Sequence, residues 1–138
     1  MNTESDDSRL ERVRAAFESV AFANFLGLKL GETKGGEPAI CLEVRDDLKQ
    51  NHGVVHGGAI ASLIDTASAF AILAVIKENE KVTTTDLTIH YLRPVTSGRM
   101  VAHARIVRAG RRRFVVSVEV ENNGALAATA ITGYVKIG

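Results

Sequence analysis

A single carboxylate lies in the middle of the most apolar stretch of this 138-residue chain. Residues 59–76 are nearly all apolar or small, and Asp65 is the one charged side chain among them. A carboxylate is costly to bury unless it is hydrogen-bonded or performs a task, and removal from water makes it a stronger base. Asp65 could activate a water molecule or attack a carbonyl carbon directly, and both roles stay open. The alternative is a structural carboxylate that hydrogen-bonds neighbouring backbone.

Two glycines, Gly57 and Gly58, open the same apolar stretch. The first N–H groups of a helix have no intrahelical partner, and glycine lets a ligand approach them closely. Such donors would stabilise a carbonyl oxygen that gains negative charge during acyl transfer, typically by about 3 to 4 kcal/mol per donor. Gly57 is the first choice as this donor, and Gly58 is a candidate substrate contact. The alternative is that both glycines only allow the helix to pack closely against a sheet.

The spacing of these residues predicts a site shared between two subunits. Gly57 and Asp65 are eight residues apart, which separates them by roughly 12 Å along one helix. A reacting carbonyl must lie about 3 Å from both the donor and the attacking group. We therefore expect two antiparallel helices from neighbouring subunits to bring Gly57 of one beside Asp65 of the other, in a dimer with two equivalent sites.

The rest of the chain predicts a single α+β domain over residues 1–138. Apolar spacing of three and four predicts an N-terminal helix within residues 8–25, and the apolar stretch predicts a buried helix from His56 to the charged Lys77. Alternating patterns predict a largely antiparallel sheet, with Asn123-Gly124 as the strongest hairpin signal. The predicted strands cover residues 28–32, 39–44, 81–91, 99–109, 112–121 and 125–137.

The stretch from Gly53 to Asp65 (GVVHGGAIASLID) resembles the signature of hotdog-fold thioesterases of the phenylacetate-degradation (PaaI-like) group. The resemblance continues in Thr84–Pro94 (TTDLTIHYLRP) and in Gly110-Arg111-Arg112. It implies a hotdog fold, in which a long central helix is wrapped by a curved antiparallel sheet of about six strands, here with an extra N-terminal helix over about residues 1–25. It also implies hydrolysis of an acyl-CoA to free acid and CoA by a homodimer or a homotetramer. The expected acyl groove is lined by residues such as Leu63, Ile64 and Phe70.

Four further candidates accompany the resemblance. His56 precedes the glycines at the expected N-cap, where it fixes the turn or contacts the surroundings of the substrate carbonyl. Thr84 matches a family position where a hydroxyl holds the attacking water, although an ordinary strand residue is the alternative. The family usually has Asn three residues before the motif's first glycine, whereas this chain has Gln50 there and Asn51 beside it. Either amide could orient the water or the catalytic carboxylate.

Seven arginines and no acidic residue lie within residues 93–113. Arginine forms bidentate contacts with phosphate, and the resemblance places the phosphates of CoA near these strand ends. Arg93, Arg111 and Arg112 are therefore candidate substrate contacts, with a solvated strand edge as the alternative. CoA would be part of the substrate, so no cofactor is expected. No metal is expected either, because His52 and His56 lack acidic or thiol company.

The composition argues against several other classes. Seventeen basic and 16 acidic residues leave a net charge of +1, which gives no reason to expect a nucleic acid or an anionic membrane surface. Asp65 argues against a membrane span, and the lone Cys41 and an acidic N-terminus fit a cytoplasmic protein. The main alternative is a non-catalytic acyl-CoA-binding module, a ligand sensor that needs no carboxylate. A hotdog hydratase or dehydratase would place its Asp and His differently from Asp65 and His56.

Overall fold

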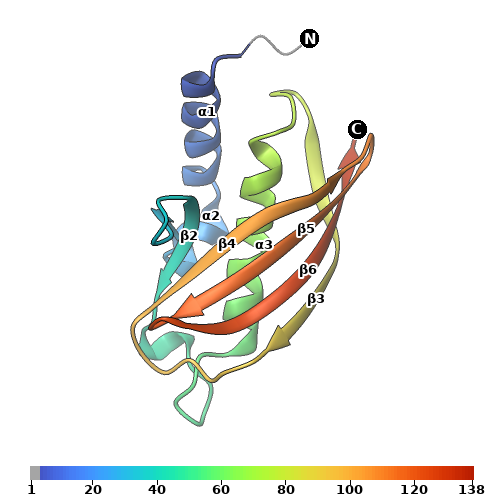
Figure 1. Cartoon of the computed structure of the whole chain (residues 1–138). Helices are drawn as coiled ribbons and strands as arrows, with labels where there is room; N and C mark the ends of the chain where they lie inside the picture. The colour runs from blue at the N-terminus through green and yellow to red at the C-terminus, as the bar shows by residue number, and fades with distance from the viewer. Residues whose placement is uncertain (1–3) are drawn as a thin grey trace.

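The computed structural model describes residues 4–138, which form a curved six-stranded antiparallel sheet around one long helix (Figure 1). The strand order across the sheet is β1-β2-β4-β5-β6-β3, which places β3 at one edge. This arrangement confirms the expected hotdog fold. The strands are β1 (Lys29–Glu32), β2 (Pro38–Glu43), β3 (Lys81–Tyr91), β4 (Arg99–Ala109), β5 (Arg113–Asn122) and β6 (Ala125–Ile137), and the helices are α1 (Asp6–Glu18), α2 (Ala21–Leu26), the short 3-10 helix η1 (Asp46–Leu48) and α3 (Gly57–Leu73).

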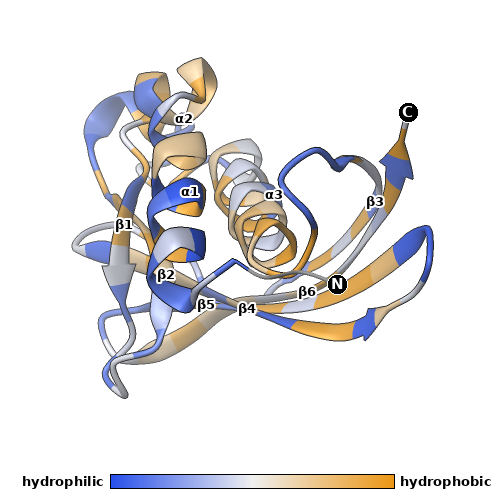
Figure 2. Ribbon diagram, turned by 90° about the horizontal axis from the view of Figure 1, so that it is seen from above, coloured by the Kyte–Doolittle hydropathy of each residue, from blue (hydrophilic) through white to orange (hydrophobic). Residues whose placement is uncertain are grey.

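All three α-helices lie on the same face of the sheet. Seen from above in Figure 2, α3 lies between α1 on one side and β3 on the other. The sheet meets α3 with an alternating apolar surface: on β5 the residues Phe114, Val116, Val118 and Val120 are buried, as the alternation predicts. Burial of this kind stabilises the domain by roughly 25 cal/mol for each Å² of apolar surface removed from water.

The N-terminal segment forms two helices, so the single helix predicted within residues 8–25 is wrong in this detail. α1 ends at Glu18, the hydroxyl of its C-cap residue Ser19 donates to the carbonyl of Ala16, and Val20 has an extended backbone. The chain then turns, and α2 buries Ala23 and Leu26. An uninterrupted helix would continue the buried face of α1, whereas the break lets a second short helix reach the core with its own apolar residues.

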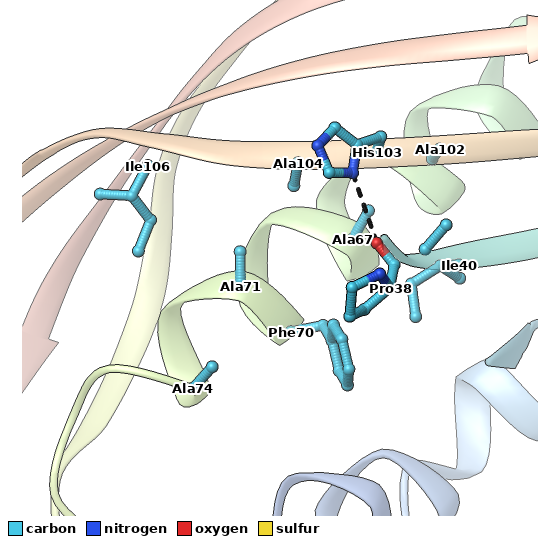
Figure 3. A pocket seen from close by; sticks show the side chains of 11 residues that line it. Pro38, Ile40, Ala67, Phe70, Ala71, Ala74, Ala102, His103, Ala104 and Ile106 are labelled. Carbon is cyan, nitrogen blue, oxygen red and sulfur yellow. Dashed lines mark hydrogen bonds between the residues drawn. The ribbon is translucent and has the colours of Figure 1, made fainter. Parts of the chain in front are cut away.

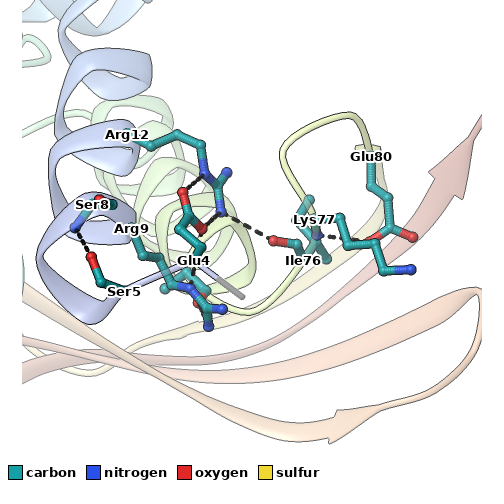
Figure 4. Close-up of polar contacts among 9 residues, drawn as sticks. Glu4, Ser5, Ser8, Arg9, Arg12, Ile76, Lys77 and Glu80 are labelled. Carbon is teal, nitrogen blue, oxygen red and sulfur yellow. Dashed lines mark hydrogen bonds and ion pairs between the residues drawn. The ribbon is translucent and has the colours of Figure 1, made fainter. Parts of the chain in front are cut away.

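Helix α1 is tied to the C-terminal end of α3 by two arginines (Figure 4). Arg9 donates to the carbonyl of Ala74 at 3.0 Å, and Arg12 donates to the carbonyl of Ile76 at 3.1 Å. These carbonyls follow the last turn of α3, where main-chain acceptors have no intrahelical partner. The helix ends at Leu73, earlier than the stop predicted at Lys77. The turn after it is held by side chains from another element.

None of the helices within residues 4–138 has the length and apolar character needed to cross a bilayer.

Candidate active site

Asp65 is half-buried on α3, on the side that faces β3 and β6. The hydroxyl of Thr84, on β3, donates to its carboxylate oxygen Oδ1 at 2.9 Å. The hydroxyl of Tyr134, on β6, makes a short hydrogen bond to the same oxygen and also contacts the main-chain carbonyl of Asp65 at 2.8 Å. Within residues 4–138 no hydrogen bond reaches Oδ2, and this oxygen is not a buried unpaired atom. Oδ2 is therefore the oxygen left for a water molecule or a substrate.

The environment of Tyr134 keeps its hydroxyl protonated, so that it can donate a hydrogen bond. Burial, followed by its hydrogen bond to Asp65, raises the pKa of the Tyr134 phenol well above its usual range, although the hydroxyls of Thr84 and Ser68 partly oppose this. Tyr134 was not among the site residues predicted from the sequence. The sequence of β6 carried a signal for it, because Ala130, Thr132 and Tyr134 occupy one buried face. A hydroxyl on such a face needs a hydrogen-bond partner.

The N-terminus of α3 leaves one N–H group available. Within the described chain Gly57 N–H donates to no acceptor, whereas Gly58 N–H donates to Nδ1 of His56 at 2.8 Å. Ala59 N–H and Ile60 N–H both donate to the carbonyl of His56. Gly57 is therefore the free donor of this first turn, and Gly58 is already occupied.

His56 makes the turn-fixing contact at the N-cap. Because Nδ1 accepts a hydrogen bond from the main chain, a neutral imidazole carries its proton on Nε2. A Cβ added at Gly58 would lie 3.0 Å from Nδ1 of His56, so a side chain there would crowd this cap. The glycine at position 58 thus serves the local turn.

Neither amide candidate contacts Asp65 within the described chain. Gln50 and Asn51 lie in the exposed loop after η1. The side-chain oxygen of Gln50 accepts from the main-chain N–H of His52 at 3.4 Å. A positive φ of 81° at Gly53 then closes this loop toward α3. The loop brings both amides to the same end of α3 as Gly57, and leaves Asp65 further along the helix.

Gly57 lines a cavity of about 250 Å³. Tyr91 covers this glycine: its hydroxyl donates to the Gly57 carbonyl at 2.8 Å, and a Cβ at position 57 would lie 3.3 Å from the tyrosine ring. Arg93 also lines the cavity and is exposed. The remaining lining residues are Val54, Val55, Ile60, Leu92, Pro94 and Val95.

The three candidate arginines do not lie close together within one copy of the chain. Arg93 follows the end of β3, whereas Arg111 and Arg112 lie in the turn between β4 and β5. Strand pairing carries this turn toward the start of β3, because Arg113 pairs with Val135, which pairs with Thr83. The two groups therefore lie at opposite ends of the sheet, roughly 30 Å apart at about 3.3 Å per residue of β3.

The other face of α3 borders an apolar cavity of about 340 Å³ between α3, β2 and β4 (Figure 3). Phe70 lines it together with small side chains such as Ala67 and Ala71. Leu63 and Ile64, expected in an acyl groove with Phe70, have no exposed surface and belong to the core. The expectation of one groove lined by all three residues is therefore wrong.

No cluster of three or more potential metal ligands occurs in the part of the chain that the structure describes.

Known proteins resemble the chain along most of its length. The family described as the thioesterase superfamily matches residues 52–128. The medium/long-chain acyl-CoA thioesterase YigI of Salmonella typhimurium is 31% identical over 98 residues, which cover 62% of this chain and 63% of YigI.

Solved structures share the fold. The PaaI protein of the phenylacetic acid degradation operon of Escherichia coli superimposes with a TM-score of 0.84 at 25% identity, over 96% of each chain. A Bacillus halodurans protein solved with CoA gives a TM-score of 0.82 at 24% identity, over 100% of this chain and 96% of that one. The family match spans more than half of the sequence and includes both Gly57 and Asp65. The chain therefore belongs to the thioesterase superfamily.

Proposed function

We propose that this protein hydrolyses acyl-CoA thioesters to a free acid and CoA, with Asp65 as the catalytic carboxylate. Its family makes it a thioester hydrolase. The acyl-CoA substrate is supported by the name of its relative YigI and by a protein of the same fold solved with CoA. The observation that carries the proposal is a half-buried carboxylate with one fixed and one free oxygen, on a helix whose first N–H is unpaired.

Each group has a chemical task in this proposal. Oδ2 of Asp65 removes a proton from a water molecule that attacks the thioester carbon, or attacks this carbon itself to give a mixed anhydride that water then cleaves. The N–H of Gly57 stabilises the negative charge that develops on the carbonyl oxygen. The C–S bond breaks, and the CoA sulfur leaves as a thiolate that takes up a proton. Thr84 acts through Asp65 by holding Oδ1.

A second copy of the chain would complete this site. Gly57 and Asp65 are separated by roughly 12 Å along α3, which is too far for one carbonyl to reach both. β3 is an 11-residue edge strand, and a long edge strand presents unpaired main-chain groups to a partner. We therefore propose that the functional unit is a dimer formed through β3.

Symmetry gives this dimer a definite geometry. Within one chain Tyr91 contacts Gly57, and Thr84 contacts Asp65. Antiparallel pairing of two β3 strands about an axis near Leu87 would set Tyr91 of one copy opposite Thr84 of the other. Gly57 of one copy would then lie near Asp65 of the second copy, twice in each dimer.

The same pairing would reunite the arginines. The Arg93 end of one β3 would lie beside the start of the other β3, the end to which Arg111 and Arg112 belong. Phosphate groups of one CoA could then meet arginines from both copies. A homotetramer made of two such dimers and a cytoplasmic location stay predictions.

The experiment that tests the function is release of free CoA thiol from phenylacetyl-, benzoyl- and straight-chain acyl-CoAs. The proposal expects turnover of at least one class by the wild-type dimer. A wild type that binds CoA and hydrolyses none of these thioesters would favour the non-catalytic acyl-CoA-binding module. If the protein hydrolyses straight-chain acyl-CoAs faster than aromatic acyl-CoAs, its substrate preference would resemble the one in the name of YigI, a medium/long-chain acyl-CoA thioesterase.

A further inference from the structure

Tyr134 combines deep burial with a hydroxyl directed at Asp65. Its side chain is 2% exposed and lies on β6, between β5 and β3. We infer that Tyr134 is a positioning residue for catalysis, one that orients the Asp65 carboxylate so that Oδ2 faces the substrate. This inference rests on the proposed function and adds to it a residue outside the sequence motif.

Strand register explains why two hydroxyls meet at one oxygen. Tyr134 and Thr84 are direct cross-strand partners in the β3–β6 pair. Side chains of such a pair lie on the same face, with Cβ atoms about 4.5 to 5.5 Å apart. Both hydroxyls therefore rise from neighbouring points of the sheet toward α3, and both bind Oδ1 of Asp65.

Two donors on one oxygen restrict the carboxylate. The terminal torsion of an aspartate is broad and nearly two-fold, so a free carboxylate exchanges its two oxygens. With Thr84 and Tyr134 bound to Oδ1, such a rotation would break two hydrogen bonds at once. Tyr134 also contacts the main-chain carbonyl of Asp65, which fixes the helix turn that carries the carboxylate.

The hydroxyl of Tyr134 has no packing purpose of its own. The ring is surrounded by a core in which phenylalanine would pack equally well, and a buried hydroxyl is costly without a partner. A second buried pair lies next to it: Thr132 donates to Ser68 at 2.9 Å, and Ser68 donates to the carbonyl of Ile64. Ser68 also interacts with the Tyr134 hydroxyl. Polar groups in this part of the core thus converge on the turn of α3 that bears Asp65.

Tyr134→Phe removes the hydroxyl and keeps the ring, so it tests the inference with little change in packing. We expect kcat to fall at least tenfold while KM for the acyl-CoA stays within about twofold, because the carboxylate loses its orientation and the binding surface is unchanged. Val118→Ala, a core change on β5, serves as the control for lost stability and should keep kcat near the wild-type value. Melting curves and size-exclusion chromatography show that each variant is a folded oligomer like the wild type.

A double-mutant cycle separates positioning from a general structural effect. If Tyr134 acts through Asp65, adding Tyr134→Phe to Asp65→Asn should leave the residual kcat of Asp65→Asn unchanged within about twofold. A wild-type-like kcat in Tyr134→Phe would overturn the inference, as would a further tenfold loss in the double variant. A wild type inactive on every thioester would instead overturn the proposed function, and with it this role.

Discussion

Replacement of Asp65 by asparagine changes the proposed base and little else. An asparagine keeps a carbonyl Oδ1 in the place where Thr84 and Tyr134 donate their hydrogen bonds, but it has an NH₂ group where Oδ2 stands. Both hydrogen bonds become neutral, which should lower the free energy of unfolding by roughly 1 to 2 kcal/mol. Loss of the base should lower kcat by about 10²- to 10⁴-fold, or about 3 to 5 kcal/mol of transition-state stabilisation.

The assay is CoA thiol release at saturating substrate, followed with the best acyl-CoA of the panel. Asp7→Asn, on the exposed first turn of α1, is the matched control and should keep the wild-type kcat. Urea unfolding and chromatography establish that Asp65→Asn remains folded and assembled. More than a tenth of the wild-type kcat in a folded Asp65→Asn protein would refute the assignment of Asp65 as the catalytic carboxylate.

Three further predictions concern the dimer, the substrate and the folded state. Leu87→Pro should remove a main-chain donor from the edge strand β3 and yield an inactive monomer, measured by light scattering and thiol release; an active monomer would contradict a shared site. Arg93→Gln should raise KM for acyl-CoA about three- to tenfold at unchanged kcat, since an exposed phosphate contact contributes roughly 1 kcal/mol, and an unchanged KM would remove Arg93 from the substrate contacts. Hydrogen bonds from Lys136 and from the Lys77 main chain hold the pKa of Glu80 below its ordinary value. Its stabilising effect is therefore present at neutral pH and lost as pH falls from about 4.5 through the lower folded pKa, so urea midpoints of Glu80→Gln and wild type should differ at pH 7 and converge in acid, below the folded pKa.

Local sequence patterns were sufficient to predict most of the strands of the sheet. The bounds of β3, β4 and β6 coincide with the alternating runs, because half-buried strands need apolar residues at every second position. The turn at Asn123 and Gly124 has φ angles of 52° and 81°, the positive values that make Asn-Gly a strong hairpin signal. The start of α3 at Gly57 also follows from the motif.

The features that the local patterns did not predict involve contacts between elements that are distant in sequence. The carbonyls just beyond the end of α3 are bound by Arg9 and Arg12, which approach from α1 more than 60 residues away in sequence. Tyr134 reaches Asp65 through the register of β3 and β6, and no local pattern reports such a register. Arg93 and Arg112 are close in sequence yet lie at opposite ends of the sheet, because the 11-residue strand β4 between them runs from one end of the sheet to the other.

The central claim is that one site combines Gly57 of one subunit with Asp65 of another, and a mixed dimer tests it directly. Gly57→Pro removes the N–H itself, and proline suits the first position of a helix. The proline Cβ would lie 3.3 Å from the Tyr91 ring, so this exposed side chain must shift slightly to accommodate it. Co-expression with Asp65→Asn under two affinity tags gives heterodimers in which one site is intact and the other carries both changes. Each parent homodimer should be inactive, and the purified heterodimer should recover about half of the wild-type kcat per dimer. Heterodimers as inactive as both parents would contradict a site shared between subunits.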